Sequence, residues 1–394
     1  MDDRGVNNTM LSGHDQRQSR ITVEGHLTLS ATINWHLSAR KIDLKALLRV
    51  ILGPAKVVDQ APLLEALNYL HHAYGDRRRK NGPAAVLHCL RIAAMLARVM
   101  PAPDTLDLLG ALLHDKEEDL TREELGTAEW DRLQAEFARV LEKIDANHRW
   151  FLGERIALLW RQESQSYYDY LGSVLSKVRT MPDLLRCKLA DRLDNTMDIA
   201  VQQTPTEQNA FFELAFSMLF LPGYRPEPRE GSVAPDGEAC VLLISQLFKN
   251  VVFMSMLRQQ QLDSLDETTS RLFYALATMS SEQAQWAVAA LLSAPTLGWQ
   301  ERRRLLREMM DYCSAGGMAA IHGKDKGGLL DGSFLEHFAE PDDKIRKKQI
   351  ETLYDDKLRF IRLLVLYIGM FASFLADPNY YVRGIDRTGL HPVG

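Results

Sequence analysis

The chain has 394 residues, of which 46% are hydrophobic and 25% charged, with a formal net charge of −5. This length suffices for about two or three domains, and the mildly acidic balance argues against broad nucleic-acid or membrane-surface binding. The cysteines are far apart and form no CxxC pair, so we expect free, mostly buried thiols in a reducing compartment. They are Cys89, Cys187, Cys240 and Cys313.

The N-terminal part of the chain shows little pattern. Residues 1–20 are polar and contain no apolar run of the kind found in signal peptides. Short β-prone pieces follow at Ile21–Val23 and Leu27–Leu29. We therefore expect residues 1–40 to form a weakly structured arm or a small accessory element.

From Leu44 onward, apolar residues recur at helical spacing, which predicts an all-α fold with a helical bundle over residues 41–220. Asp104 is a predicted helix N-cap. The expected helices are Ala61–His72, Ala84–Met100, Asp104–His114, Glu129–Asp145, Tyr167–Val178 and Leu184–Ala200.

A segment rich in proline and glycine, residues 221–238, predicts a linker or long loop. Further helices are expected after it, within a C-terminal region of residues 239–394. Three roles are open for that region: packing on the first half, forming a homo-oligomer, or binding a regulator. The expected helices are Ala239–Gln261, Glu267–Met279, Glu282–Ser293, Gln300–Tyr312 and Asp343–Ala376, with a glycine-rich loop at Gly316–Gly332.

The most apolar stretch of the chain is Leu363–Leu375, which follows Arg359 and Arg362. A helix needs roughly 18–20 apolar residues to span a bilayer, and this stretch is shorter. We therefore interpret it as a buried helix, with a lipid-facing role as the alternative, and we expect a soluble, cytoplasmic protein with no membrane partner.

Three predicted helical segments carry histidine and aspartate in an order that suits one metal ion. His88 lies in an apolar helix, His114 and Asp115 follow the apolar run Leu106–Leu113, and Asp191 follows another apolar run. Imidazole and carboxylate together suit Mn²⁺, Fe²⁺, Co²⁺ or Zn²⁺. Four such ligands leave room for water and a phosphate oxygen, as metal-assisted hydrolysis requires.

Carboxylates follow the His-Asp pair by one helical turn. Glu118 and Asp119 are four residues beyond His114 and Asp115, which places them beside the metal, where one could act as general base. Similarly, Lys188 and Asn195 lie one turn before and after the fourth ligand, on the same helix.

Each of these residues also has a purely structural interpretation. A lone His88 is more often a core histidine, and Asp191 alone could be a surface partner of Arg192. The acidic run Glu117–Asp119 could be a solvated turn, and His14-Asp15 in the polar tail receives no function. Only the joint occurrence, in order and on apolar helices, favours a metal site.

A basic cluster, Arg77–Lys80, precedes the first histidine and is followed by Asn81-Gly82. It could be a solvated loop. Alternatively, its cationic side chains could bind phosphates, and one arginine could stack on a base. Its proximity to His88 favours an anionic substrate over nucleic acid, since the rest of the chain is not basic.

These residues resemble the HD superfamily of metal-dependent phosphohydrolases, over roughly residues 60–200. The likeness is closest to the alarmone hydrolase domain of RelA/SpoT-type enzymes, and the YYDY stretch at 167–170 resembles small stand-alone members. The matching motifs are Arg79-Lys80-Asn81-Gly82, His88, His114-Asp115-Lys116-Glu117-Glu118-Asp119, and Lys188-Leu189-Ala190-Asp191-Arg192-Leu193-Asp194-Asn195.

The resemblance implies hydrolysis of the 3′-pyrophosphate of (p)ppGpp to GDP or GTP, with Mn²⁺ as cofactor. It assigns water activation to Glu118 and Asp119 and contact with the purine base to Arg79. By the same resemblance, the metal ligands are His88, His114, Asp115 and Asp191, and the nucleotide site includes Lys80, Asn81, Lys188 and Asn195.

The chain departs from the family around the basic loop. It has Pro83-Ala84-Ala85 where Glu-Pro-Tyr is usual, Asn81 in place of serine, and Cys89 in place of proline. These changes leave the metal set intact but alter the region assigned to base recognition. Another nucleotide substrate, or a non-catalytic regulatory protein with an HD fold, are the alternatives. The helical second half does not resemble the family's synthetase domain, so we expect no synthetase activity.

Overall fold

The computed structural model describes residues 21–57, 59–79, 83–162, 165, 167–198, 235–260, 266–292, 300, 342, 344–345, 371, 374–375, 379–382, 385–386 and 389–390. Within these residues the predicted all-α class is confirmed. The helices are α2 (Val23–Leu37), α3 (Leu44–Leu52), α4 (Ala61–Tyr74), α5 (Val86–Val99), α6 (Thr105–Leu113), α7 (Lys116–Asp119), α8 (Arg122–Leu125), α9 (Thr127–Glu142), α10 (Ala146–Leu159), α11 (Tyr167–Lys177), α12 (Pro182–Met197), α14 (Pro235–Gln259) and α15 (Glu267–Leu292). Two-residue strands, β1 (Ile385–Asp386) and β2 (Gly389–Leu390), pair antiparallel.

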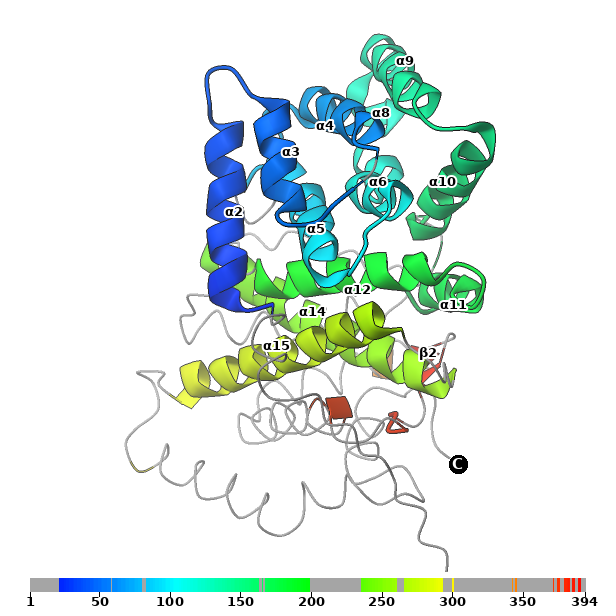
Figure 1. The fold of residues 1–394 in the computed structure, drawn as a ribbon. Coiled ribbons are helices and arrows are strands. Elements are labelled where there is room, and N and C mark those ends of the chain that lie inside the picture. Colours follow the sequence, from blue (N-terminus) through cyan, green and yellow to red (C-terminus); the bar gives the residue numbers. More distant parts are fainter. Residues whose placement is uncertain are drawn as a thin grey trace, which may run out of the picture.

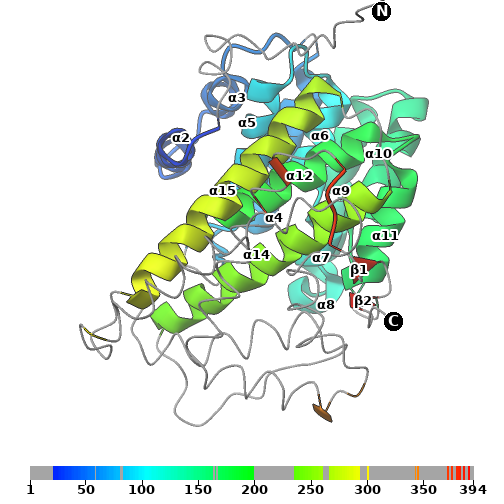
Figure 2. The same cartoon turned by 90° about the horizontal axis from the view of Figure 1, so that it is seen from below.

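Helix α12 occupies the centre of the fold. Figure 1 shows it crossing the molecule between the helices of the first half and the pair α14 and α15. Seen from below, α14 and α15 run in roughly the same direction as α12 and pack along it (Figure 2). Because neighbours cover α12 on several sides, every residue from Leu189 to Met197 is buried.

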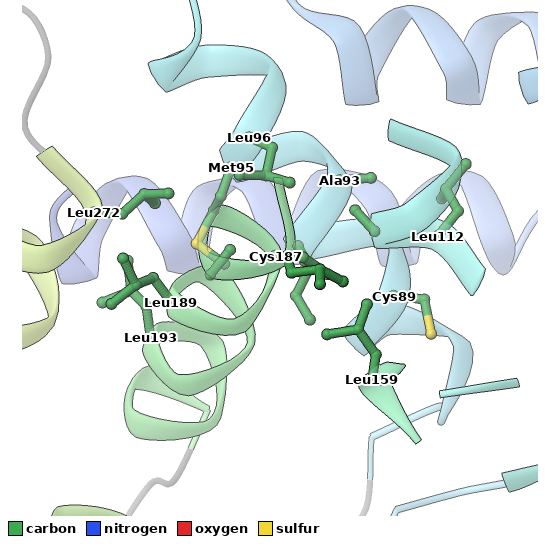
Figure 3. Close-up of a cluster of buried hydrophobic side chains, with 14 of the residues drawn as sticks. Cys89, Ala93, Met95, Leu96, Leu112, Leu159, Cys187, Leu189, Leu193 and Leu272 are labelled. Atoms are coloured by element: carbon green, nitrogen blue, oxygen red, sulfur yellow. The ribbon is translucent and has the colours of Figure 1, made fainter. Parts of the chain in front are cut away.

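The apolar residues of α12 join the core of the first half to α15. Figure 3 shows Leu189 and Leu193 of α12 close to Leu272 of α15, with side chains of α5 and α6 around them. Leu189, Leu193 and Leu272 are all fully buried. The first half and the helices after residue 235 therefore share one hydrophobic core.

The chain turns sharply at the His-Asp pair. Helix α6 begins at Asp104, whose carboxylate accepts hydrogen bonds from the backbone N–H groups of Leu106 and Asp107, so the predicted N-cap is confirmed. The helix ends with His114 as its C-cap, and Asp115 has φ −94° and ψ 4°, outside helical geometry. This break lets the two neighbouring side chains converge, which a continuous helix would prevent.

The expected weakly structured arm is wrong for residues 23–37, which form α2; residues 1–20 lie outside the described part of the chain. The Thr22 hydroxyl caps the helix by accepting a hydrogen bond from the Gly25 N–H. His26, Leu29 and Ile33 then form one buried face against the rest of the fold. The local β preference of this segment is overridden by the cap and by this i, i+3, i+7 stripe.

Other helix boundaries also differ from the predictions. Asp145 was expected to end one helix, but its carboxylate caps the next, α10, which the spacing did not predict. Helix α14 begins at Pro235, inside the predicted linker of residues 221–238. The two helices expected around Ser280 are one, α15, because Ser280 is buried and accepts a hydrogen bond from Asn250 of α14.

Several predictions fall on residues outside the described part of the chain. These are most of the linker, the glycine-rich loop Gly316–Gly332, and most of the helices expected at Gln300–Tyr312 and Asp343–Ala376. Of the apolar stretch Leu363–Leu375, Phe371 and Phe374 are buried. Among the described helices, none has the length and apolar character needed to cross a membrane.

The shared core predicts that α15 contributes to stability. We expect Leu272→Ala to lower the free energy of unfolding by about 2–5 kcal/mol, since it removes a fully buried side chain at the α12 contact. Leu27→Ala is the matched control, because Leu27 is 58% exposed. Chemical denaturation of both variants measures the difference, and equal losses would contradict the shared core.

Candidate metal centre

Two imidazoles and a carboxylate converge where α5 meets the α6–α7 turn. One ligand atom from each of His88, His114 and Asp115 lies within 4.8 Å of the others, so this group could hold a metal ion. Nε2 of His88 is 3.3 Å from Asp115 Oδ2, and Nε2 of His114 is 3.0 Å from Asp115 Oδ1. The predicted ligands on separate helices are thus brought together.

The hydrogen bonds of the two imidazoles leave their Nε2 atoms facing the centre. His88 Nδ1 lies 2.8 Å from Asp194 Oδ2, and His114 Nδ1 lies 2.9 Å from the Ala111 carbonyl oxygen. Both acceptors require the proton on Nδ1, which leaves the Nε2 lone pair for a metal. His114 Nε2 is buried and has no hydrogen-bond partner among the described residues. A metal ion would satisfy that atom, so the donor set fits a transition metal.

Asp191, the fourth predicted ligand, lies beside this group. Its Oδ1 is 3.4 Å from His88 Nε2, although it is not within 4.8 Å of all three other ligand atoms. Its carboxylate is also bound by Lys188 Nζ at 2.7 Å, by Arg192 Nη2 at 3.0 Å, and by the Asn195 amide. The Asp191 carboxylate therefore connects the imidazoles to two cations on its own helix.

The acidic groups make the centre favourable for positive charge. Burial lowers the pKa of His88, but hydrogen bonds to Asp115, Asp191 and Asp194 outweigh it and raise that pKa to about 10. Burial also opposes protonation of His114, and the Asp115 charge raises its pKa to about 10. The carboxylates thus retain protons on both rings, and a bound metal ion would displace them.

Asp194, which we did not predict as a site residue, orients the first imidazole. Besides accepting from His88, it receives two hydrogen bonds of 2.8 Å from the Arg91 guanidinium. His26 Nδ1 of α2 is 3.8 Å from Asp194 Oδ1. Carboxylates that hold a metal-ligating histidine in this way fix its tautomer and orientation. Only the spacing of Asp194, three residues after Asp191 and hence on a neighbouring part of the same helix face, could have indicated it.

The predicted catalytic carboxylates face the same space. Glu118 and Asp119 are on α7, and Asp119 Oδ2 accepts a 2.8 Å hydrogen bond from the buried Tyr74 hydroxyl. Burial, reinforced by the Asp115 charge, raises the pKa of both carboxyl groups. Tyr74 is another site residue that the sequence did not single out, since it reads as one apolar position of α4.

A cavity opens over the centre in two connected lobes of about 550 and 210 Å³. Both lobes are lined by Arg79, His88, Asp115, Glu118, Asp119, Asn195 and Gln246. The larger lobe adds Tyr74 and Arg77, whereas the smaller adds Lys188 and Asp191. The combined size suits a small-molecule ligand rather than a single ion.

The predicted substrate-binding residues divide into two groups. Arg79, Lys188 and Asn195 line the cavity, and Arg79 Nη2 donates a 2.7 Å hydrogen bond to the Asn195 side-chain oxygen. Lys80 and Asn81 lie outside the described residues.

Comparison with family models, with curated proteins and with solved structures finds no match. The geometry of this site and its motifs therefore provide the evidence for function. Among the described residues, the site contains both kinds of metal-binding group that the motifs predict, imidazole and carboxylate.

Metal binding can be tested through stability. At a divalent metal concentration about 100-fold above Kd, we expect the folded state to gain about 2.7 kcal/mol, seen as a higher thermal midpoint. His114→Ala should remove this gain because it deletes a converging nitrogen. His148→Ala, an exposed histidine on α10 that does not line the cavity, should retain it. An equal gain in both variants would contradict the centre.

The orienting role of Asp194 gives a second prediction. We expect Asp194→Asn to weaken metal affinity roughly 10–100-fold, the usual loss when such a supporting carboxylate is replaced. Competition with a chromogenic chelator measures this affinity. Asp183→Asn, on the first turn of the same helix and outside the cavity, is the control. Unchanged affinity in Asp194→Asn would show that this carboxylate does not support the ligand.

Proposed function

We propose that this protein is a metal-dependent phosphohydrolase that removes the 3′-pyrophosphate of (p)ppGpp. The observation that carries the proposal is one cavity in which converging imidazoles and carboxylates, two further acids and several cations meet. From the sequence, the His…His-Asp…Asp order and the motifs His114–Asp119 and Lys188–Asn195 support the proposal.

A resident divalent ion would be held by His88, His114, Asp115 and Asp191, with Mn²⁺ as the proposed metal. When bound, such an ion polarises a phosphoryl oxygen and lowers the pKa of water. Asp191 is proposed as the fourth ligand because Oδ1 lies 3.4 Å from His88 Nε2.

Glu118 and Asp119 would orient the attacking water and accept its proton. In the net reaction one water is consumed, the P–O bond to the ribose 3′-oxygen breaks, and a 3′-hydroxyl and pyrophosphate form. One carboxylate accepts the proton of the water as its oxygen bonds to phosphorus. The 2.8 Å hydrogen bond from Tyr74 orients the Asp119 carboxylate, and Arg77 fixes its backbone carbonyl at 2.7 Å.

The larger lobe would take the nucleoside. Its volume of about 550 Å³ is within the range of small-molecule sites. Arg79 is 27% exposed and faces this lobe, so its guanidinium can stack on a purine or bind a phosphate. We propose a cytoplasmic reaction, since nucleotides and reduced thiols such as the free, buried Cys89 and Cys187 occur together there.

Two alternatives use the same site. The departures around residues 81–89 favour testing a different phosphorylated nucleotide, because they fall where the purine would bind. A non-catalytic regulatory protein would have no need of acids beside the ligands, and Glu118 and Asp119 line both lobes. We therefore favour catalysis, and hydrolysis without synthesis of the alarmone.

The direct test incubates the full-length protein with ppGpp and Mn²⁺, and separates the products by ion-exchange chromatography. We expect GDP and pyrophosphate, and loss of both products when the metal is chelated. A panel of other nucleotides run in parallel identifies the substrate. Cleavage of another nucleotide but not ppGpp would favour the first alternative, and no cleavage of any would favour the second.

Two substitutions separate chemistry from binding. We expect Asp119→Asn to lower kcat about 10²–10⁴-fold, the usual contribution of a general base. Arg79→Ala should mainly raise KM. Steady-state kinetics measure both, with Asp131→Asn as the control because Asp131 is exposed on α9 and outside the cavity. Wild-type turnover by Asp119→Asn would refute the role given to that carboxylate.

A further inference from the structure

The smaller lobe of the cavity is lined on one side by cations. Arg161 follows α10, Lys188 and Arg192 belong to α12, and Lys249 belongs to α14. All four line the lobe of about 210 Å³ that also contains Asp191. Residues from three separate parts of the chain thus concentrate positive charge beside the metal centre.

Two of these cations have an acidic partner. Lys188 Nζ is 2.7 Å from Asp191 Oδ2, and Arg192 Nη2 is 3.0 Å from the same oxygen. Arg192 Nη1 also donates a 2.6 Å hydrogen bond to the Gln246 side chain of α14. These two side chains hold the proposed metal ligand and line the cavity, but their charges are shared with Asp191.

The other two cations have no acidic partner within the part of the chain that the structure describes. Arg161 is exposed and makes no ion pair there. Lys249 Nζ lies 5.5 Å from the centre of the Tyr167 ring, and no hydrogen-bond acceptor of this ammonium is found among the described residues. Burial, together with the charges of Arg192 and Arg161, lowers the pKa of Lys249 to about 7. The ligand-free protein therefore disfavours the charged form of Lys249, and an anion bound beside it would favour that form.

The fold positions Lys249 for the cavity. Gln246 and Lys249 are three residues apart on α14, so they share one helix face, and both line the lobe. The Tyr167 hydroxyl donates a 3.4 Å hydrogen bond to the Lys249 carbonyl, which connects α14 to α11. Helix α14 lies beyond the region of residues 60–200 that carries the sequence motifs, so no motif includes this lysine.

We infer that Arg161 and Lys249 form an anion subsite that binds a second phosphate group of the substrate, beside the phosphate at the metal centre. A phosphate group carries about two negative charges at neutral pH, which two unpaired cations balance. Both cations can donate charge-assisted hydrogen bonds to phosphate oxygens. The site therefore favours a pyrophosphate ester over a phosphate monoester.

This inference rests on the proposed function for the identity of the substrate, but anion binding can be measured without turnover. Inorganic pyrophosphate is titrated into the full-length protein, without added metal, by calorimetry. We expect saturable binding that is at least about tenfold weaker in Lys249→Gln and in Arg161→Gln, since each loses a charge-assisted contact. Inorganic phosphate should bind more weakly than pyrophosphate.

Two further variants serve as controls for this titration. Lys177→Gln, on an exposed lysine of α11 outside the cavity, should bind as wild type does. Lys249→Arg, which retains the charge, should retain most of the affinity. The thermal midpoint of ligand-free Lys249→Gln should be equal to or above that of wild type, because a disfavoured charge is removed. A lysine with only a structural role would lower that midpoint and leave pyrophosphate affinity unchanged.

The outcomes separate the two proposals. Wild-type pyrophosphate affinity in Lys249→Gln, or no binding by the wild-type protein, would overturn the anion subsite even if ppGpp is hydrolysed. Binding that depends on Lys249, with no nucleotide cleaved, would support the subsite and refute the proposed hydrolysis.

Discussion

The buried charges of α12 are the constraint on which the rest of the structure depends. Lys188, Asp191, Arg192 and Asp194 are all at most 7% exposed. A buried charge without a partner is strongly destabilising, so each must meet an opposite charge or a hydrogen-bonding group. Those partners come from neighbouring helices, which ties the position of α12 to the position of the site.

Asp191 and Asp194 of α12 contact different nitrogens of the same imidazole, although they are only three residues apart. Asp194 binds the Arg91 guanidinium through two hydrogen bonds and accepts from His88 Nδ1. Asp191 faces Nε2 of the same ring. The His88 imidazole thus lies between Asp194, which orients it, and Asp191, which faces the nitrogen that points toward the candidate metal centre. Moving α12 relative to α5 would disturb both contacts together.

The sequence predicted the parts of the site that depend on spacing along one helix or on a short motif. His88 and the His114-Asp115 pair were identified because they stand in apolar helices, and the fold brings them together. The roles of Asp194 and Tyr74 were not predicted, because their partners His88 and Asp119 are 106 and 45 residues away in the sequence. The same reason explains α2, whose helical state depends on a face buried against distant helices.

The relation of α14 to the site shows why the second half could not be interpreted from its pattern. A single lysine on a helix carries no signal, and the role inferred for Lys249 depends on the cations that the fold places around it. Asp191 lies between these cations and the imidazoles, and it contacts both. Its single charge cannot neutralise the lysine and arginine side chains, which favours an anion on their side, whereas the acids around the imidazoles favour a cation there. Under the proposed function, a metal ion and a phosphorylated substrate would supply that pair.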